Sequence, residues 1–346
     1  MEATVKSPIL VTGASGYIAS HLIKLLLERG YRVRGTVRSL ANKTKNNFIY
    51  NLVPEKNDHL ELVEANLTSK EDWKKAVEGC EYIFHVASPI PPSMPQDENE
   101  LIIPAVEGTL NVLEAAIEKG TKKVVVTSSG TAIMFGGADR PIKNEDDWSD
   151  ESKCPPYPKS KVKAERAAWK FYEDHKDKIE VTVVNPGLVM GPVFTKHGNS
   201  SESLFSDILT GVLPGVLEEA KWGPVDVRDV AEAHYRAMFY EGTNGKRYIC
   251  VPGESTTMID MLQTLKKELA QDGGKINDKI TTPEEIMASE SQAGKRMVLM
   301  SKNRGPISKM SNERSLQELK MVYTPIKQTA VDMDHSLIKI GGGLPQ

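Results

Sequence analysis

The stretch of sequence that decides the fold spans residues 9–27 and reads ILVTGASGYIASHLIKLLL. It begins with a short β-branched run and ends with apolar residues at helical spacing, so it predicts a strand that turns directly into a helix. Glycine in the turn lets a pyrophosphate approach the backbone, where the N-terminal end of the helix favours an anion. Glycine also serves any tight turn, but the flanking strand and helix favour a nucleotide. The expected binding residues are Gly13, Ser15, Gly16, Tyr17 and Ile18.

The chain after this stretch continues to alternate short β-branched runs with helix-patterned segments. The further runs span 33–37, 60–63, 82–86, 124–127 and 181–184, and the candidate helices lie near 17–29, 71–79, 101–119 and 158–175. This alternation predicts an α/β fold with a doubly wound parallel sheet, the Rossmann arrangement. Beyond residue 187 the alternation fades. We expect a Rossmann domain over 1–187 and a smaller, mainly substrate-binding lobe over 188–346, with segments such as 225–250 returning to the first domain.

Composition excludes several classes of protein. The 346 residues carry 44 Lys and Arg against 47 Asp and Glu, so there is no positive excess to neutralise nucleic acid. Three widely spaced cysteines, never in a CxxC pair, exclude a disulfide framework and a cysteine-based zinc site. The sequence shows no long apolar stretch of a signal peptide or of a membrane span. We therefore expect a cytoplasmic protein with no metal, no membrane partner and no nucleic-acid partner, as a monomer or a homodimer.

The end of the second expected strand selects the kind of dinucleotide. An acidic residue there would bind a ribose 2′-hydroxyl and repel a 2′-phosphate. The chain instead places Arg38 there, followed by Lys43 and Lys45, with no acid before Glu55. Arginine can donate two hydrogen bonds to a phosphate. This predicts NADPH rather than NADH, although Arg38 could also be a surface cation that closes the strand.

Two motifs indicate proton transfer. Tyr157 and Lys161 stand four residues apart in a helical pattern, which places both side chains on one face. A phenol titrates near pH 10, so a nearby positive charge is needed to favour phenolate. The fifth run ends in Ser128 and Ser129, where a hydroxyl can donate to a reacting carbonyl oxygen. Strand alternation turns Ser128 to the other side. Serines after strands also simply make turns, and Tyr and Lys often share a helix face as neighbours.

Together these motifs resemble the extended branch of the short-chain dehydrogenase/reductase superfamily, and the dihydroflavonol reductase group within it. That group also contains cinnamoyl-CoA reductases and the yeast methylglyoxal and aldehyde reductases. The matching segments are Gly13-x-x-Gly16-x-x-Ala19, Thr36-Val37-Arg38, His85-Val86-Ala87-Ser88-Pro89, Thr127-Ser128-Ser129, Tyr157-x-x-x-Lys161, Asn185-Pro186-Gly187-Leu188-Val189-Met190-Gly191-Pro192 and Val225-Asp226-Val227-Arg228-Asp229-Val230-Ala231-Glu232-Ala233-His234.

The resemblance implies an NADPH-dependent carbonyl reductase that transfers a hydride from the nicotinamide. Tyr157 would protonate the nascent alkoxide, Lys161 would hold the nicotinamide ribose and lower the tyrosine pKa, and Ser129 would polarise the carbonyl. Arg38 with Lys43 or Lys45 would bind the 2′-phosphate. The other implied cofactor contacts are Val86, Ala87, Ser88 and Thr127, with Pro186, Leu188 and Val189 near the nicotinamide.

One position departs from the family pattern, and the substrate stays open. Asn66-Leu67 stands where the family usually has Asp and a small aliphatic residue that reads the adenine amino group. The candidate substrate contacts are Ile90, Met134 and Phe205, which suit a small hydrophobic or aromatic carbonyl compound but would also suit a packed core. Two other functions compete: a sugar epimerase or dehydratase with the same Tyr and Lys, and a non-catalytic nucleotide-sensing module.

Overall fold

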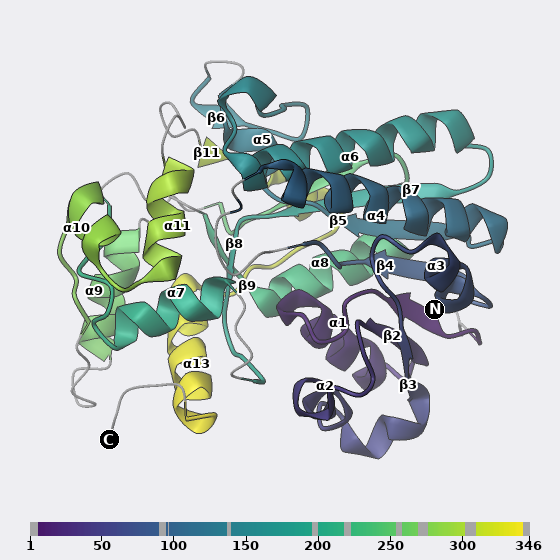
Figure 1. The fold of residues 1–346 in the computed structure, drawn as a ribbon, viewed down its shortest axis with the longest axis horizontal. Helices are drawn as coiled ribbons and strands as arrows, with labels where there is room; N and C mark the ends of the chain where they lie inside the picture. Colours follow the sequence, from purple (N-terminus) through teal and green to yellow (C-terminus); the bar gives the residue numbers. More distant parts are fainter. Residues whose placement is uncertain are drawn as a thin grey trace.

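The computed structural model describes residues 6–89, 95, 97–136, 140–195, 200–217, 223–253, 258–268, 276–301 and 309–341. Its centre is a seven-stranded parallel sheet with the strand order β10-β7-β5-β4-β1-β2-β3 (Figure 1). The strands are β1 (Ile9–Val11), β2 (Val33–Val37), β3 (Leu60–Glu64), β4 (Tyr82–His85), β5 (Lys123–Thr127), β7 (Glu180–Pro186) and β10 (Arg247–Cys250). The order reverses between β1 and β4, so the predicted doubly wound Rossmann fold is confirmed.

Helices cover both faces of this sheet. On one face α3, α4 and α6 pack side by side, and on the other α1 packs against α8 (Figure 1). Their bounds are α1 (Tyr17–Glu28), α2 (Lys43–Tyr50), α3 (Lys70–Val77), α4 (Asn99–Glu118), α6 (Pro156–His175) and α8 (Val227–Phe239). The short helix α2 and the edge strand β10 were not among the segments predicted by periodicity.

A second group of helices lies beside the sheet, beyond the carboxyl ends of its strands (Figure 1). It consists of α7 (Ser200–Leu209), α9 (Met258–Glu268), α10 (Pro283–Ala288), α11 (Gln292–Ser301) and α13 (Ile326–Lys339). Small parallel pairs join it to the sheet: β8 (Leu188–Met190) with β9 (Pro224–Asp226), and β6 (Ile142–Lys143) with β11 (Lys309–Met310). The remaining short elements are α5 (Thr131–Met134), α12 (Glu313–Gln317), η1 (Pro54–His59) and η2 (Glu151–Lys153).

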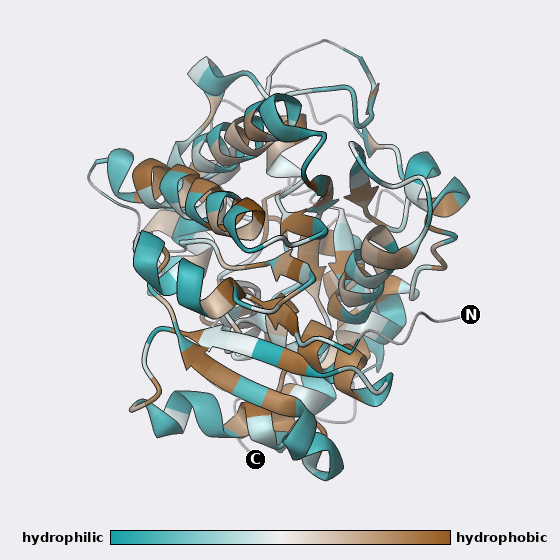
Figure 2. Cartoon of the chain, turned by 90° about the vertical axis from the view of Figure 1, so that its right-hand side faces the viewer, coloured by the Kyte–Doolittle hydropathy of each residue, from teal (hydrophilic) through white to brown (hydrophobic). Residues whose placement is uncertain are grey.

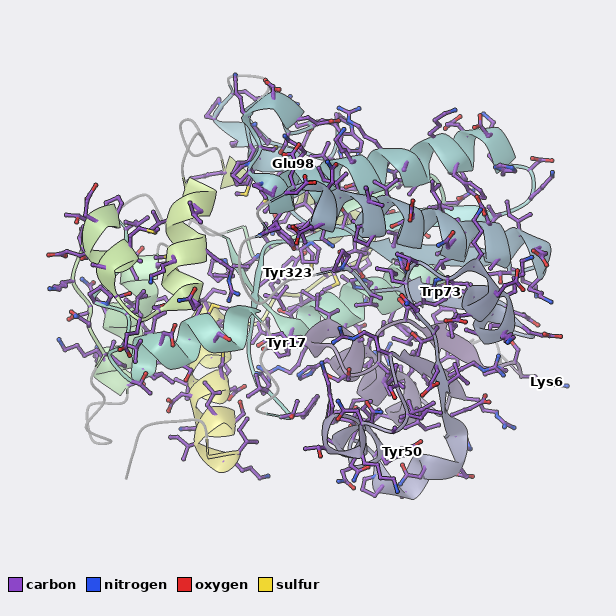
Figure 3. The ribbon with its side chains drawn as sticks, viewed as in Figure 1. Lys6, Tyr17, Tyr50, Trp73, Glu98 and Tyr323 are labelled. Atoms are coloured by element: carbon purple, nitrogen blue, oxygen red, sulfur yellow. The ribbon has the colours of Figure 1, made fainter. Side chains whose placement is uncertain are left out.

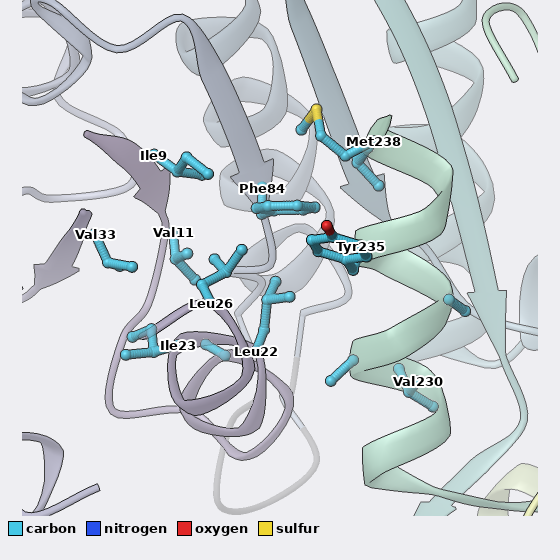
Figure 4. Close-up of a cluster of buried hydrophobic side chains, with 14 of the residues drawn as sticks. Ile9, Val11, Leu22, Ile23, Leu26, Val33, Phe84, Val230, Tyr235 and Met238 are labelled. Atoms are coloured by element: carbon cyan, nitrogen blue, oxygen red, sulfur yellow. The ribbon is translucent and has the colours of Figure 1, made fainter. Parts of the chain in front are cut away.

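Apolar side chains bury both faces of the sheet, as period-two alternation requires. Ile9 and Val11 of β1 point toward α1 and α8, where they meet Leu22 and Phe84 (Figure 4). Leu10, between them, belongs to the cluster on the opposite face. Figure 2 shows the same arrangement, with apolar residues on the central strands and polar residues on the outer faces of the helices. The sheet is therefore buried on both of its faces.

The second group of helices has its own apolar core. Phe205, Met261, Leu262 and Met333 are all nearly inaccessible to solvent in it. Within the described ranges, no helix is both long and apolar enough to cross a membrane. The same residues contain no group of three His, Cys, Asp or Glu side chains placed to hold a metal ion.

Candidate active site

The glycine turn after β1 forms a backbone cradle. Gly13 adopts φ +70°, and a Cβ there would lie 3.2 Å from the Cβ of Ala87. A Cβ at Gly16 would lie 3.0 Å from the carbonyl oxygen of Gly13. Glycine at these two positions therefore avoids contacts that a side chain would make with Ala87 and with the turn itself, and a backbone without side chains is what close approach of a pyrophosphate requires.

The N-terminal end of α1 adds an anion-binding surface to this cradle. Gly16 is the N-cap residue, and no side chain caps the helix. The first turn of α1, which begins with Tyr17 and Ile18, directs the positive end of the helix dipole toward the glycine turn, where it favours an anion, and Ser15 lies just before it. The predicted glycine-turn residues fit the diphosphate of a dinucleotide.

Tyr17 links this turn to the second group of helices. Its hydroxyl donates a 2.5 Å hydrogen bond to the carbonyl of Gly191, just after β8. His21, one turn along α1, bonds the carbonyl of Pro192 at 2.8 Å and stacks on Phe194. Tyr17 accordingly lies between the two parts of the molecule in Figure 3. A ligand seated on the glycine turn would lie at this junction.

The basic residues after β2 are arranged for a phosphate. Arg38 and Lys43 are exposed, and Lys45 is half-buried on α2. Burial lowers the pKa of Lys45, and the Arg38 charge lowers it further. Two cations that repel each other across a small space fit a doubly charged 2′-phosphate. The carboxylate of Glu64 accepts a hydrogen bond from the Leu40 amide at 2.6 Å, so an acid is also close to this loop.

Thr12, which sequence reasoning missed, shapes the end of β4. Its hydroxyl accepts hydrogen bonds from the amides of Val86 and Ala87 at 3.0 and 2.9 Å and lies 3.1 Å from His85 Nδ1. This brings the half-buried segment Val86, Ala87 and Ser88 to the side of Gly13. The predicted adenosine and ribose contacts therefore adjoin the glycine turn.

The Asn66-Leu67 pair is already engaged with protein groups. Asn66 Oδ1 accepts from the amide and the hydroxyl of Thr68, both at 3.3 Å. Leu67 packs so closely on α4 that a Cβ at Gly108 would lie 2.3 Å from its Cγ. The Oδ1 atom of the exposed Asn66 is thus already hydrogen-bonded within a local turn. It is therefore less suited to accept a hydrogen bond from an adenine amino group.

Ser129 lies at the carboxyl end of β5 with a polarised hydroxyl. Its Oγ accepts from the amide and the hydroxyl of Thr131 at 3.1 and 3.0 Å. Its own proton is then the remaining donor. The neighbouring Ser128 points the other way and donates to Glu165 at 2.5 Å, as strand alternation predicted.

Tyr157 and Lys161 stand on one face of α6, next to this serine. Lys161 Nζ lies 6.0 Å from the centroid of the Tyr157 ring and 3.5 Å from the carbonyl oxygen of Thr127. Desolvation raises the pKa of Tyr157 to about 12, against the lowering effect of its hydrogen bond with Ser129. Burial also lowers the pKa of Lys161 to about 8, while the charge of Glu165 raises it. The expected fall in the tyrosine pKa is not found, because desolvation outweighs the lowering effect of the Ser129 hydrogen bond.

The predicted nicotinamide contacts bridge the sheet and the second group of helices. Pro186 ends β7, and its carbonyl accepts from the Gly130 amide at 2.7 Å. Leu188 and Val189 are half-buried in β8. A Cβ at Gly187 would lie 2.0 Å from the carbonyl oxygen of Gly223, so only glycine allows this crossing. Pro186 thus adjoins the strand end that carries Ser129, and Leu188 and Val189 follow it in β8, which pairs with β9.

Of the three candidate substrate contacts, two are buried and one lies outside the described residues. Met134 is 7% exposed in a cluster that includes Met310, and Phe205 is 1% exposed in the core of the second group of helices. Ile90 belongs to the segment that the structure does not describe. A cavity between α9 and α13 is lined by side chains such as Asp260 and Lys327, and none of the catalytic candidates lines it.

Comparison with known proteins agrees with this geometry. Residues 9–250 match the model of the NAD dependent epimerase/dehydratase family. Cinnamoyl-CoA reductase 1 of Petunia hybrida is 34% identical over 350 residues, which is 99% of this chain and 95% of the relative. An anthocyanidin reductase of Vitis vinifera is 33% identical over 283 residues, with 77% of this chain and 82% of the relative covered.

Solved structures give the same assignment. The yeast methylglyoxal/isovaleraldehyde reductase Gre2, complexed with NADPH, matches with a TM-score of 0.79 and 26% identity over 97% of this chain and 99% of that one. Vestitone reductase from alfalfa matches with a TM-score of 0.76 and 26% identity over 97% of this chain and 100% of that one. Since the family model spans the region from β1 to β10 and the relatives are reductases, the chain belongs to the NAD dependent epimerase/dehydratase family, as an oxidoreductase of the extended short-chain dehydrogenases/reductases.

Proposed function

We propose that this protein reduces small, hydrophobic or aromatic aldehydes and ketones with NADPH. The observation that carries the proposal is the meeting of Ser129, Tyr157 and Lys161 where β5 ends, beside the glycine turn. The relatives named for cinnamoyl-CoA, anthocyanidin and methylglyoxal reduction support a carbonyl substrate.

Each catalytic side chain has a distinct task. The dinucleotide, when bound, supplies the hydride that adds to the carbonyl carbon. Ser129 donates its proton as a hydrogen bond to the carbonyl oxygen, because Thr131 already occupies it as an acceptor. Tyr157 remains a neutral phenol at neutral pH, since its pKa is about 12, and transfers its proton to that oxygen as negative charge develops. The remaining phenolate faces the Lys161 side chain.

The preference for NADPH rests on the basic residues after β2. Lys45 is the better partner for Arg38 than Lys43, since its pKa is lowered by the Arg38 charge and its side chain is half-buried. A 2′-phosphate between Arg38 and Lys45 would relieve their repulsion and accept hydrogen bonds from both. NADH lacks that phosphate, so it would leave the two cations unpaired.

A panel of carbonyl compounds tests the proposal. Matched aryl and methyl aldehydes and ketones are mixed with the protein and either NADPH or NADH, and consumption of the dinucleotide is followed by absorbance. We expect NADPH to be consumed with the aryl compounds and NADH to react far more slowly at equal concentration. If no member of the panel consumes either dinucleotide, the proposed function is wrong.

A further inference from the structure

Glu165 is a buried carboxylate one helical turn beyond Lys161 that the proposed reaction does not use. It is 1% exposed, yet both of its oxygens are paired. Oε2 accepts from Ser128 Oγ at 2.5 Å and from Asn185 Nδ2 at 2.8 Å. Oε1 accepts from Arg247 Nε at 2.5 Å and from Trp169 Nε1 at 3.1 Å. A buried carboxylate without partners would strongly destabilise the fold. The four donors, from four places in the chain, compensate for the burial of this charge.

Two of the four donors come from the segments that carry the catalytic side chains: Ser128 from the end of β5 and Trp169 from α6. Ser128 directly precedes Ser129 at the end of β5, and Asn185 of β7 also donates to the carbonyl of Ser129 at 3.2 Å. Glu165 itself belongs to α6, the helix of Tyr157 and Lys161. One carboxylate therefore ties the catalytic strand end to the catalytic helix. The separation of the Ser129 hydroxyl from Tyr157 depends on this tie.

Arg247, the counter-charge, is held from its other side by the acidic segment that precedes α6. Its Nη1 donates to the carbonyls of Glu145 and Asp147 at 2.8 and 2.7 Å. Its guanidinium carbon lies 3.9 Å from the centroid of the Trp148 ring. Arg247 is 6% exposed, so water is largely kept from the ion pair. The Glu165 charge thus acts on its surroundings with little screening.

The groups that face Lys161 leave Glu165 as its one close carboxylate among the described residues. From β4 comes His85, whose pKa burial lowers to about 3, so its ring is neutral. From β5 comes the carbonyl oxygen of Thr127. On α6 itself stand the neutral phenol of Tyr157 and the Glu165 carboxylate, which raises the pKa of Lys161 against the effect of burial. Around Glu165, the charged groups on other elements are Arg247 and, behind it, the buried Glu145.

We propose that Glu165 is a positioning residue of this site: through Ser128 and Asn185 it holds the Ser129 strand end against the helix that carries Tyr157 and Lys161. This inference rests on the proposed carbonyl reduction. Removing the charge loosens the strand end, and it also makes the ammonium form of Lys161 easier to deprotonate. The first effect lowers kcat, and the second moves the alkaline limb of its pH profile.

The test compares Glu165→Gln with Glu165→Asp in the full-length protein. NADPH oxidation by an aryl aldehyde is measured from acid to alkaline pH, with kcat and KM separated. We expect Glu165→Gln to lower kcat by on the order of tenfold or more through misplaced groups. We also expect the alkaline limb to move to lower pH, with the KM for NADPH little changed. Glu165→Asp keeps the charge at a shorter reach, so its alkaline limb stays near that of the wild type while its kcat falls.

Two further variants keep the result interpretable. Glu232→Gln removes a carboxylate that pairs with Arg29 and Arg236 at 2.7 and 2.5 Å on the far side of the sheet, so it should cost stability without moving the pH profile. Ser128→Ala removes one donor but leaves the ion pair, and it should lower kcat even if Glu165→Gln does not fold.

Wild-type kcat and pH profile in both Glu165→Gln and Ser128→Ala would overturn the inference alone. So would a lower kcat in Glu165→Gln with an unmoved alkaline limb. An inactive wild type would overturn the proposed function, and this inference with it.

Discussion

The Tyr157 phenol and the Lys161 ammonium are shifted in opposite senses by the same environment. Poor solvation penalises the charged form of each, so the pKa of the phenol rises to about 12 and that of the ammonium falls to about 8. At neutral pH the pair therefore stands as a neutral acid beside a cation that is close to titrating. That state suits proton donation to a developing alkoxide.

Replacement of Tyr157 by phenylalanine removes the hydroxyl proton and leaves the ring, so it measures the contribution of that proton to turnover. We expect Tyr157→Phe to lower kcat by about 10²–10⁴-fold, because general acid catalysis contributes on that scale. Binding of NADPH, measured by fluorescence titration, should hardly change. Tyr172→Phe, farther along the same helix, is the matched control and should retain activity. Near-normal turnover in Tyr157→Phe would contradict the role given to this residue.

The two lysines of α2 differ in burial: Lys45 is half-buried and feels the charge of Arg38, whereas Lys43 is exposed. Lys45→Gln should raise the KM for NADPH by about 10–100-fold, since a hydrogen bond between charged groups contributes roughly 1.5–3 kcal/mol. Lys43→Gln, on the exposed side of the same helix, should change it by much less. Neither substitution should affect the KM for NADH. An equal effect of the two substitutions would remove Lys45 from the 2′-phosphate site.

At the scale of elements, the turn from β1 into α1 is the most constrained connection of the nucleotide half. Its conformation depends on Gly13, whose φ of +70° is unfavourable for other residues and whose α-carbon faces Ala87. Ala87 lies in the segment that follows β4, and the Thr12 hydroxyl accepts a hydrogen bond from its amide. The turn is thus shaped from both sides before any ligand binds.

Two glycine substitutions distinguish backbone strain from lost binding. Gly30 also has a positive φ, of +83°, but a Cβ there meets nothing within 4 Å. Gly30→Ala should lower the free energy of unfolding by roughly 1–2 kcal/mol and leave NADPH affinity intact. Gly13→Ala should lose similar stability and, in addition, most of the NADPH affinity. Urea unfolding and fluorescence titration of both variants measure this, and unchanged binding in Gly13→Ala would argue against a pyrophosphate at the turn.

Sequence patterns predicted the elements with strong periodicity and missed those without it. The runs in β1, β4, β5 and β7 became inner strands because burial on both faces demands nearly continuous apolar residues, whereas the edge strand β3, LELVE, alternates buried and exposed positions. The helix α2 is mostly polar, KTKNNFIY, and the edge strand β10 is only RYIC, so neither carries a clear period. Their places in the fold are set by packing against the sheet.

The same distinction holds for the candidate site. Tyr157 and Lys161 could be paired from the sequence because four residues on a helix fix their relation. The bonds from Thr12 to His85 and from Arg247 to Glu165 join residues 73 and 82 positions apart. No local pattern encodes such contacts, since they arise only when the strands have been ordered in the sheet.

At the scale of the whole molecule, three histidines are buried in neutral form around the central sheet. Burial lowers the pKa of His21 to about 4, of His85 to about 3 and of His234 to about 4. In the unfolded chain each would titrate at about 6.5. Between those values the unfolded state binds more protons, so stability falls as the pH falls below about 6.5. Asp229 acts in the opposite sense, since burial raises its pKa to about 6 and its protonation favours the folded state.

Acid should therefore weaken the fold well above the usual titration range of carboxylates. Each buried histidine contributes a loss of roughly 1.4 kcal/mol per pH unit below its unfolded pKa. Urea unfolding at several pH values between neutral and mildly acid measures the slope. His234→Gln should lower that slope by roughly 1.4 kcal/mol per pH unit, because it removes one of the three buried neutral imidazoles. A flat dependence of stability on pH in this range would contradict the buried neutral histidines.

Phe205 tests how the second group of helices relates to the substrate. Its ring is 1% exposed among Met190, Leu204 and Ile208, so Phe205→Ala should cost about 3–5 kcal/mol of unfolding free energy. If Phe205 also contacts substrate, the ratio of kcat/KM for a matched aryl and methyl ketone should shift as well. A fixed ratio with lowered stability would make Phe205 a core residue only and move the pocket wall elsewhere.

The pairing of Glu165 with Arg247 also has a consequence for how the protein is made. Arg247 lies in β10, the last strand of the central sheet to leave the ribosome. Ser129, Tyr157 and Lys161 have all been synthesised before it. Until that strand docks, the Glu165 carboxylate has no buried counter-charge and must stay hydrated. The helix α6 therefore cannot pack against β5 and β7 in a water-free contact before that point. Nascent chains should accordingly stay inactive until residue 250 is available, although they already contain Ser129, Tyr157 and Lys161. In refolding followed by hydrogen exchange, the amide of Ile249 should become protected at the moment when activity returns.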